Sequence, residues 1–112
     1  MRVVIKKVGQ IGEVVEVENT LETWNDIVGG WIQTFPLASD MLIICNEEGK
    51  LKGLEPNVEI VVGECSELIV GDFAIVKQGY DDFEGLDDEQ IERLRKCGLI
   101  KYKNKLNIIF KG

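Results

Sequence analysis

Apolar and polar residues alternate at the start of the chain, which is the pattern of a half-buried β-strand. Met1 to Lys7 places Val3 and Ile5 on one face at a period of two. Short apolar segments recur at 14–17, 31–35, 41–45, 58–62, 67–70 and 73–76. Turn residues separate these segments at 9–12, 36–40, 46–50, 56–57 and 79–85. Residues 51–54 are compatible with either a short strand or a loop. This pattern predicts a chain built mostly from short strands.

A helix is predicted after the second strand. Leu21, Trp24, Ile27 and Val28 recur at helical spacing and would form one apolar face. Asn19 stands three residues before Glu22, which is the spacing of a capping box. Two consecutive glycines at 29–30 are expected to end the helix, because glycine readily adopts the left-handed conformation found there.

The second predicted helix has clear signals at both ends. Asp87 is a suitable N-cap with Gln90 at the third helical position, and Leu86 is placed to pack on Ile91. Gly98 is the expected residue just beyond the helix. The basic residues near its C-terminus, Arg93, Arg95 and Lys96, would interact favourably with the negative end of the helix dipole.

The C-terminal segment alternates again. Apolar residues occupy even-numbered positions from Ile100 to Phe110, and lysines occupy the odd-numbered positions 101, 103 and 105. This predicts an amphipathic strand, or a hairpin that turns near Asn104. The expected fold class is α+β, with two short helices packed on a mostly antiparallel sheet. We expect a single domain over residues 1–112, with a core over 1–97 and a basic C-terminal strand or hairpin over 98–112.

The charges are divided unevenly along the chain. The net charge is −7, yet residues 91–112 carry seven basic residues and only one acidic residue, Glu92. The acidic balance argues against direct binding of nucleic acid, which needs a basic face. No apolar run approaches the roughly 20 residues of a membrane helix. The three widely spaced cysteines favour reduced, mostly buried thiols. A soluble cytoplasmic protein is therefore expected.

Four sequence blocks carry a resemblance to a known group of proteins. In order, they are Asn19-Thr20-Leu21-Glu22, Val28-Gly29-Gly30-Trp31-Ile32, residues 42–51 (LIICNEEGKL) and Gly71-Asp72-Phe73. Together they resemble a family of small domains of unknown function encoded by bacterial phages and mobile elements, and the match covers about residues 1–95. The resemblance implies a compact α+β domain in a bacterial cytosol, and it implies no reaction, cofactor or catalytic residue.

Catalytic chemistry has little support in the residues. The chain contains no histidine, so the commonest general base and zinc ligand are both missing. Acidic residues crowd positions 81–89, but their spacing does not fit an EF-hand loop, and Asp87 is better explained as a helix cap. The prediction is a non-enzymatic protein with no catalytic residue, metal or cofactor.

Two binding functions remain open, both for a phage or mobile-element accessory protein that counters a host defence. In the first, the protein sequesters a small anionic, nucleotide-like ligand, with a tryptophan stacked on the base and basic groups on the phosphate. The candidate residues are Trp24, Trp31, Arg93, Lys96, Lys101, Lys103 and Lys105. A simpler interpretation makes both tryptophans core residues and the lysines a solubilising face.

In the second, an acidic surface mimics nucleic acid and inhibits a basic host protein. Its candidate residues are Asp81, Asp82, Glu84, Asp88 and Glu89. A solvated acidic face is the plainer interpretation of the same residues. The complementary charges of the two regions also suggest a homo-oligomer held by contacts between acidic and basic surfaces.

Overall fold

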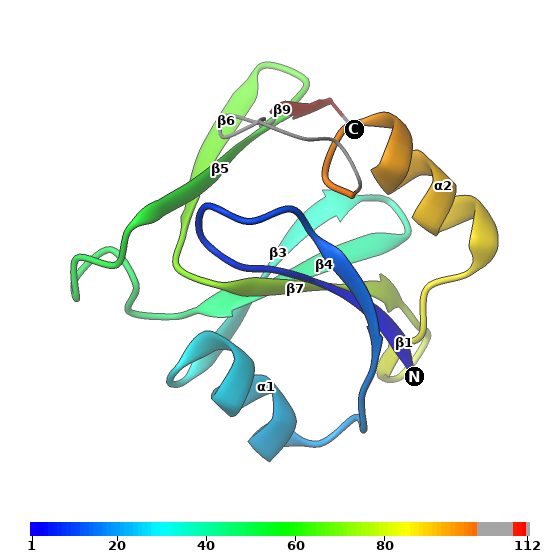
Figure 1. Ribbon diagram of the computed structural model, residues 1–112, viewed down its shortest axis with the longest axis horizontal. Helices are drawn as coiled ribbons and strands as arrows, with labels where there is room; N and C mark the ends of the chain where they lie inside the picture. The colour runs from blue at the N-terminus through cyan, green and yellow to red at the C-terminus, as the bar shows by residue number, and fades with distance from the viewer. Residues whose placement is uncertain (101–108, 112) are drawn as a thin grey trace.

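The computed structural model describes residues 1–100 and 109–111, which form two packed sheets and two helices (Figure 1). The larger, six-stranded sheet has the order β2-β1-β7-β4-β3, with β8 paired to β7, and the smaller sheet has the order β6-β5-β9. The strands are β1 (Arg2–Lys6), β2 (Glu13–Glu16), β3 (Ile32–Ala38), β4 (Met41–Asn46), β5 (Pro56–Val62), β6 (Cys65–Val70), β7 (Phe73–Gln78), β8 (Phe83–Glu84) and β9 (Ile109–Lys111). The helices are α1 (Leu21–Val28) and α2 (Asp88–Lys96). The predicted α+β class with a mostly antiparallel sheet is confirmed.

The larger sheet separates two apolar cores. Because successive side chains of a strand point to opposite faces, neighbouring residues serve different cores. Ile43 and Ile75 face the small sheet and α2, whereas Ile44 and Ala74 face α1. Figure 1 shows α1 below the large sheet and the β5–β6 hairpin with α2 on the opposite side. The order of layers is therefore helix, large sheet, then small sheet with helix.

A buried polar cluster joins the two sheets. Lys6 at the end of β1 is 2% exposed, and its Nζ donates to Oδ1 of Asn57 in β5 at 2.8 Å. Nδ2 of Asn57 donates in turn to the carbonyls of Lys6 at 3.0 Å and Gly71 at 2.8 Å. Desolvation lowers the pKa of the Lys6 ammonium, and the nearby carboxylate of Asp72 partly opposes this. The cluster supplies buried polar groups with the partners that they need.

The predicted first helix is present, but its predicted cap is wrong. Thr20 is the N-cap, since its side chain accepts from the backbone N–H of Thr23. The side chain of Asn19 instead accepts from Nε1 of Trp24 at 2.9 Å, so Asn19 and Glu22 do not form a capping box. Gly29 ends the helix with φ of +78°, as expected for glycine in the left-handed region.

The predicted signals of the second helix are confirmed. Asp87 and Gln90 form a capping box, and Gly98 follows the helix with φ of +91°. The amide of Gln90 also donates to the backbone carbonyl and the carboxylate of Asp40, in the turn between β3 and β4. This contact fixes the start of α2 to the end of the β3–β4 hairpin.

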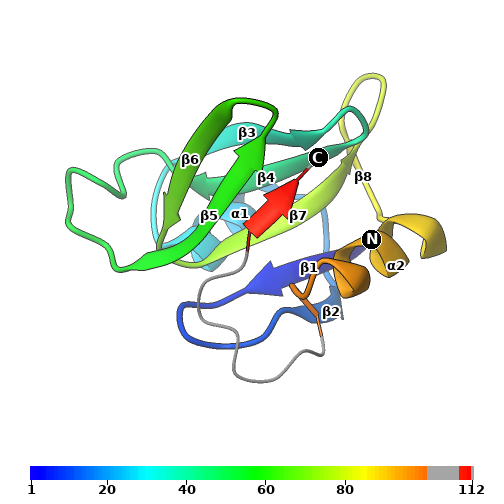
Figure 2. The same cartoon turned by 90° about the horizontal axis from the view of Figure 1, so that it is seen from above.

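Several boundaries differ from the sequence pattern. β3 continues through Pro36 to Ala38, which is tolerated because β3 is an edge strand with an irregular register there. Pro56 begins β5 where a break was expected, residues 51–54 are a loop, and the acidic loop at 79–85 contains the short strand β8. The C-terminal prediction at residues 101–108 lies outside the described residues. Figure 2 shows β9 beside β5, and this pair is parallel.

Candidate binding cleft between the first hairpin and the second helix

A cleft of about 720 Å³ lies between the β1–β2 hairpin and α2. Its volume falls within the range of pockets that hold small organic ligands, roughly 300–1,000 Å³. The lining residues are Arg2, Ile11, Gly12, Glu13, Val14, Asp88, Ile91, Glu92, Arg95 and Ile100. Residues from opposite ends of the chain therefore build one concave surface.

One wall of the cleft depends on a close backbone contact at Gly12. The N–H of Gly12 donates to the carbonyl of Leu99 at 2.7 Å, and Gly12 forms a parallel bridge with Ile100. A Cβ at position 12 would lie 2.6 Å from that same carbonyl oxygen, so glycine permits the contact. The contact joins the turn after β1 to the segment after α2.

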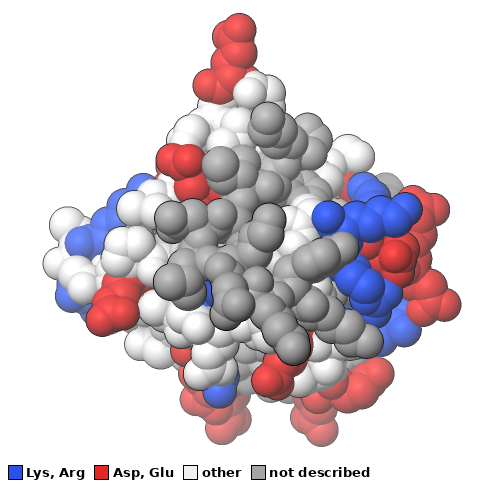
Figure 3. Space-filling model, turned by 45° about the horizontal axis from the view of Figure 1, so that its top comes forward, with Lys and Arg blue, Asp and Glu red and all other residues white. Residues whose placement is uncertain are grey.

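Two arginines and three carboxylates surround an apolar floor. The guanidinium of Arg2 donates from Nε and Nη2 to the carbonyl of Leu86, at 3.1 and 2.9 Å, and Nη1 pairs with Asp88 at 2.9 Å. Arg95 pairs with Glu92, one turn earlier on α2. Figure 3 shows basic and acidic side chains interleaved on the side of the molecule that carries α2.

The two arginines differ in how strongly the protein holds them. Two hydrogen bonds and one ion pair fix the guanidinium of Arg2. Arg95 makes one ion pair, and its buried Nε has no hydrogen-bond partner among the described residues. Ile91 and Ile100 form the apolar floor and are 7% and 3% exposed. The arrangement therefore offers guanidinium donors beside an apolar surface, with Arg95 the more adaptable donor.

The two tryptophans predicted as ligand residues have different environments. Trp24 is 2% exposed and packs edge-on against Phe83, with ring centroids 5.8 Å apart. Its ring is a core anchor that no ligand can stack on in this structure. Trp31 is 62% exposed, so the core interpretation is wrong for this residue. Neither tryptophan lines the cleft.

The predicted basic residues do not converge on the tryptophans. Arg93 pairs with Asp40 beyond the end of β3, whereas Trp31 precedes the start of that seven-residue strand. At the usual rise of a strand, the two sites are roughly 20 Å apart. Lys96 is exposed at the end of α2 and does not line the cleft. Lys101, Lys103 and Lys105 lie outside the described residues.

Asp40 and Arg93 form a contact that serves the fold. Partial desolvation disfavours the charge on Asp40, but hydrogen bonds from Arg93 and Gln90 outweigh it and keep the pKa of Asp40 below its ordinary value. This ion pair joins the β3–β4 turn to α2. Arg93 is therefore engaged in a contact that stabilises the fold.

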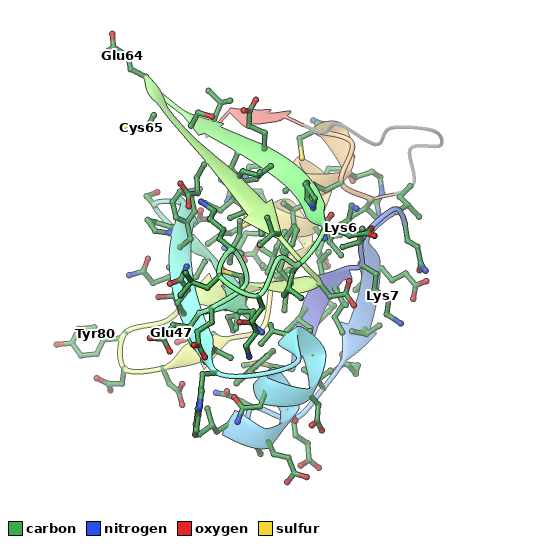
Figure 4. All side chains as sticks on the ribbon, turned by 90° about the vertical axis from the view of Figure 1, so that its left-hand side faces the viewer. Lys6, Lys7, Glu47, Glu64, Cys65 and Tyr80 are labelled. Carbon is green, nitrogen blue, oxygen red and sulfur yellow. The ribbon has the colours of Figure 1, made fainter. Side chains whose placement is uncertain are left out.

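The predicted acidic residues fall on two neighbouring elements. Asp81 and Asp82 lie in the turn before β8, Glu84 lies on β8, and Asp88 and Glu89 lie in the first turn of α2. All five are exposed, and Asp88 is also part of the cleft. Tyr80, beside Asp81, is 97% exposed and projects from the molecule in Figure 4. Within the part of the chain that the structure describes, no three His, Cys, Asp or Glu residues are placed to hold a metal ion.

Sequence reasoning missed the site residues Arg2 and Arg95, although a signal for the second was present. Asp88, Ile91, Glu92 and Arg95 are spaced by three and four residues, so they share one face of α2. This face lines the cleft. No local pattern indicates that Arg2 would face it, because the contact depends on how the first strand packs beside the helix.

Comparison with protein families assigns most of the chain. The family described as "Domain of unknown function (DUF3846)" matches residues 1–98. The chain belongs to the DUF3846 family. No curated protein and no solved structure shows a significant match to it. The predicted membership of a small family of unknown function is confirmed, and the phage origin stays a prediction.

Two of the sequence blocks that carried the resemblance meet in this DUF3846 domain. Asn46 is 5% exposed; its Nδ2 donates to the carbonyl of Val28 at 3.1 Å, and its Oδ1 accepts from the N–H of Glu48 at 2.8 Å. Gly30 packs against this amide, since a Cβ there would lie 3.0 Å from Nδ2. Asn46 therefore joins the end of α1 to the loop after β4.

The cysteines of the DUF3846 domain are free thiols with different exposure. Cys45 is buried and Cys97 is half-buried, and desolvation raises the pKa of both thiols. Cys65 is exposed at the start of β6 (Figure 4), so the expectation of burial is wrong for this residue. In the described residues, no helix is long and apolar enough to cross a membrane.

Proposed function

We propose that this DUF3846 protein is a non-catalytic binding protein that sequesters a small anionic, nucleotide-like ligand in the cleft between the β1–β2 hairpin and α2. The observation that carries the proposal is that Arg2 and Arg95 line the same cleft of about 720 Å³ as the apolar residues Ile91 and Ile100. The protein would act in the bacterial cytoplasm as a phage or mobile-element accessory protein that removes a signal of host defence. The structural support concerns the binding site, and the biological setting rests on the sequence resemblance.

The chemistry of the cleft suits a nucleotide. A guanidinium binds phosphate oxygens through two parallel hydrogen bonds, and Arg95 would exchange its pair with Glu92 for such a contact. Ile91 and Ile100 would contact the face of the base. The carboxylates of Glu13 and Glu92 would accept hydrogen bonds from base or ribose donors. The chain has no histidine, which favours binding over catalysis.

The proposal is tested by calorimetric titration of the purified protein with a panel of mononucleotides and cyclic dinucleotides. Arg95→Ala should weaken binding by about tenfold or more, because loss of a charge-assisted contact costs roughly 1.5–3 kcal/mol. Lys96→Ala is the matched control, since it removes one positive charge from the same helix outside the cleft. Equal losses in both variants, or binding unchanged in Arg95→Ala, would contradict the proposed site.

A second candidate function has one specific observation in its favour. Tyr80 is 97% exposed in the turn that carries Asp81 and Asp82, and exposed tyrosines are frequent anchors of protein interfaces. The acidic surface around it would bind a basic host protein in place of nucleic acid. Co-purification from host lysate should be lost with the paired change Asp81→Asn and Asp82→Asn, and kept with Glu22→Gln on α1. The reverse pattern would rule this surface out.

The predicted homo-oligomer is a separate proposal. If acidic and basic surfaces of two copies hold it together, sedimentation should show the oligomer at low salt and its loss at high salt, because salt screens exposed charges. A monomer at both salt concentrations would rule it out.

A further inference from the structure

A second surface of the protein, remote from the cleft, exposes a large aromatic residue. Trp31 precedes β3 and is 62% exposed, whereas the other tryptophan is 2% exposed. Leu51, in the loop after β4, is 89% exposed. Exposed apolar side chains of this size on neighbouring segments provide contact area for a partner.

The backbone beneath Trp31 is held in place from two sides. The N–H of Glu47 donates to the carbonyl of Trp31 at 2.8 Å, and the buried amide of Asn46 fixes the adjoining end of α1 and the loop residue Glu48. A partner that contacts Trp31 would therefore meet an ordered backbone, which reduces the entropic cost of binding.

Trp31 and Glu47 are opposite each other in the sheet register. Ile32 pairs with Asn46, and the hydrogen bond between Trp31 and Glu47 continues this antiparallel register by one position. Side chains of such a pair leave the same face, with Cβ atoms about 5 Å apart. Glu47 is exposed (Figure 4) and forms no ion pair with any described residue. From this register, the carboxylate of Glu47 and the indole of Trp31 are expected to leave the sheet side by side.

A small recess lies beside Glu47. It has a volume of about 100 Å³, and its lining includes Gln33, Glu47, Lys50, Leu51 and Glu67. Lys50 already pairs with Glu67 at 2.9 Å, which leaves Glu47 as the carboxylate available to an incoming group. The recess is smaller than ordinary metabolite pockets, which start at roughly 300 Å³, so it suits the end of one side chain.

We propose that this surface, formed by Trp31, Glu47 and Leu51, binds an arginine or lysine side chain of a protein partner. The indole face attracts a cation through its quadrupole, and tryptophan is the best side chain for this contact. Glu47 would pair with the same cation, and Leu51 would pack on the flanking residues of the partner. The acidic net charge of −7 would draw a basic partner towards the protein.

The nearby charges favour this partner over a nucleotide. Lys50 pairs with Glu67 and Lys52 lies 3.9 Å from Glu48, so these four charges are largely balanced. The remaining charge, on Glu47, forms no ion pair with any described residue and favours an incoming cation over a phosphate. The proposal concerns a different surface from the cleft, and it does not depend on the ligand proposed there.

Indole N–H signals in NMR spectra offer a direct test, because the chain contains only two tryptophans. The probe is a short peptide with two arginines separated by glycines, and its control is the same peptide with citrulline, which keeps the shape but lacks the charge. The chemical shift of the Trp31 indole N–H should change on addition of the arginine peptide and should not change with the citrulline peptide. The chemical shift of the buried Trp24 indole N–H should not change in either titration. Glu47→Gln should weaken peptide binding at least threefold.

Variant controls separate this surface from the rest of the molecule. Tyr80→Ala removes another exposed aromatic residue and Arg95→Ala changes the cleft; both should leave peptide binding unchanged. Equal shifts with both peptides, no shift with the arginine peptide, or a Trp31 shift with nucleotides alone would each overturn the proposal. Trp31 and Glu47 are both exposed, so their variants are expected to fold.

Discussion

Replacing Asn57 by alanine should destabilise the protein strongly, because this side chain connects the two sheets through three buried hydrogen bonds. One accepts from the Lys6 ammonium at 2.8 Å, and two are donated to the carbonyls of Lys6 and Gly71 at 3.0 and 2.8 Å. A hydrogen bond to a charged group contributes roughly 1.5–3 kcal/mol and a neutral one roughly 1 kcal/mol. The three together would give about 3.5–5 kcal/mol.

The expected loss is somewhat smaller than that sum. The Lys6 ammonium keeps a second acceptor, the carbonyl of Lys7 at 3.0 Å, so it does not become wholly unpaired. We therefore expect Asn57→Ala to lower the free energy of unfolding by about 3 kcal/mol. For a domain of this size, this corresponds to a fall in Tm of roughly 12–20 °C. Urea unfolding followed by circular dichroism measures the difference.

A double-mutant cycle tests the reasoning behind this number. In a Lys6→Met background the buried charge is gone, so Asn57→Ala should cost at least 1 kcal/mol less there than in the wild type, which is a typical coupling between contacting residues. Asn25→Ala is the matched control, because the buried Oδ1 of Asn25 has no hydrogen-bond partner among the described residues. A loss below 1 kcal/mol for Asn57→Ala, or an additive cycle, would refute the account of this cluster.

Three further predictions concern pH, packing and thiol exposure. The pKa of Asp40 is lowered in the folded protein, so its contribution to stability is present above the unfolded pKa of about 3.9 and is lost as the pH falls through the folded pKa. Arg93→Gln should therefore lower the free energy of unfolding by about 1 kcal/mol or less at pH 7, since both groups are partly exposed, and by progressively less as the pH falls below about 3.9 in chemical unfolding. Gly12→Ala should lower stability by about 1–3 kcal/mol in the same assay, because its Cβ would lie 2.6 Å from a backbone oxygen; an unchanged midpoint would contradict this. In a thiol-labelling time course Cys65 should react first and buried Cys45 only after unfolding, and simultaneous labelling would contradict the burial assigned to them.

Local signals predicted the elements well, because capping and alternation are properties of neighbouring residues. Asp87, Gln90 and Gly98 defined the second helix correctly, whereas Asn19 was mistaken for a cap because Thr20 beside it has equal capping chemistry. The division of the strands into two sheets was not predictable, since it depends on long-range pairs such as Val4 with Ile75. The spacing of apolar residues indicates that a residue is buried, but it does not indicate which of the two cores the residue enters.

The site was harder to predict than the fold. Trp31 and Arg93 have side chains suited to one nucleotide site, but in the structure they are separated by the length of β3. Arg2 was not predicted as a site residue, because it is 93 positions from Arg95 in the chain although both line the same cleft. Binding residues that come from distant segments of the chain do not form a local sequence pattern. Arg2 and Arg95 could therefore be recognised only from the packing of β1 beside α2.

The most direct test of the central proposal is native mass spectrometry of the protein purified from bacteria that naturally produce it, alongside Arg95→Ala expressed in the same cells. The proposal predicts that the wild type carries a small phosphate-bearing molecule, which is released on denaturation, and that the variant carries much less of it. A wild type without such a ligand, or equal occupancy in both proteins, would contradict sequestration in the cleft.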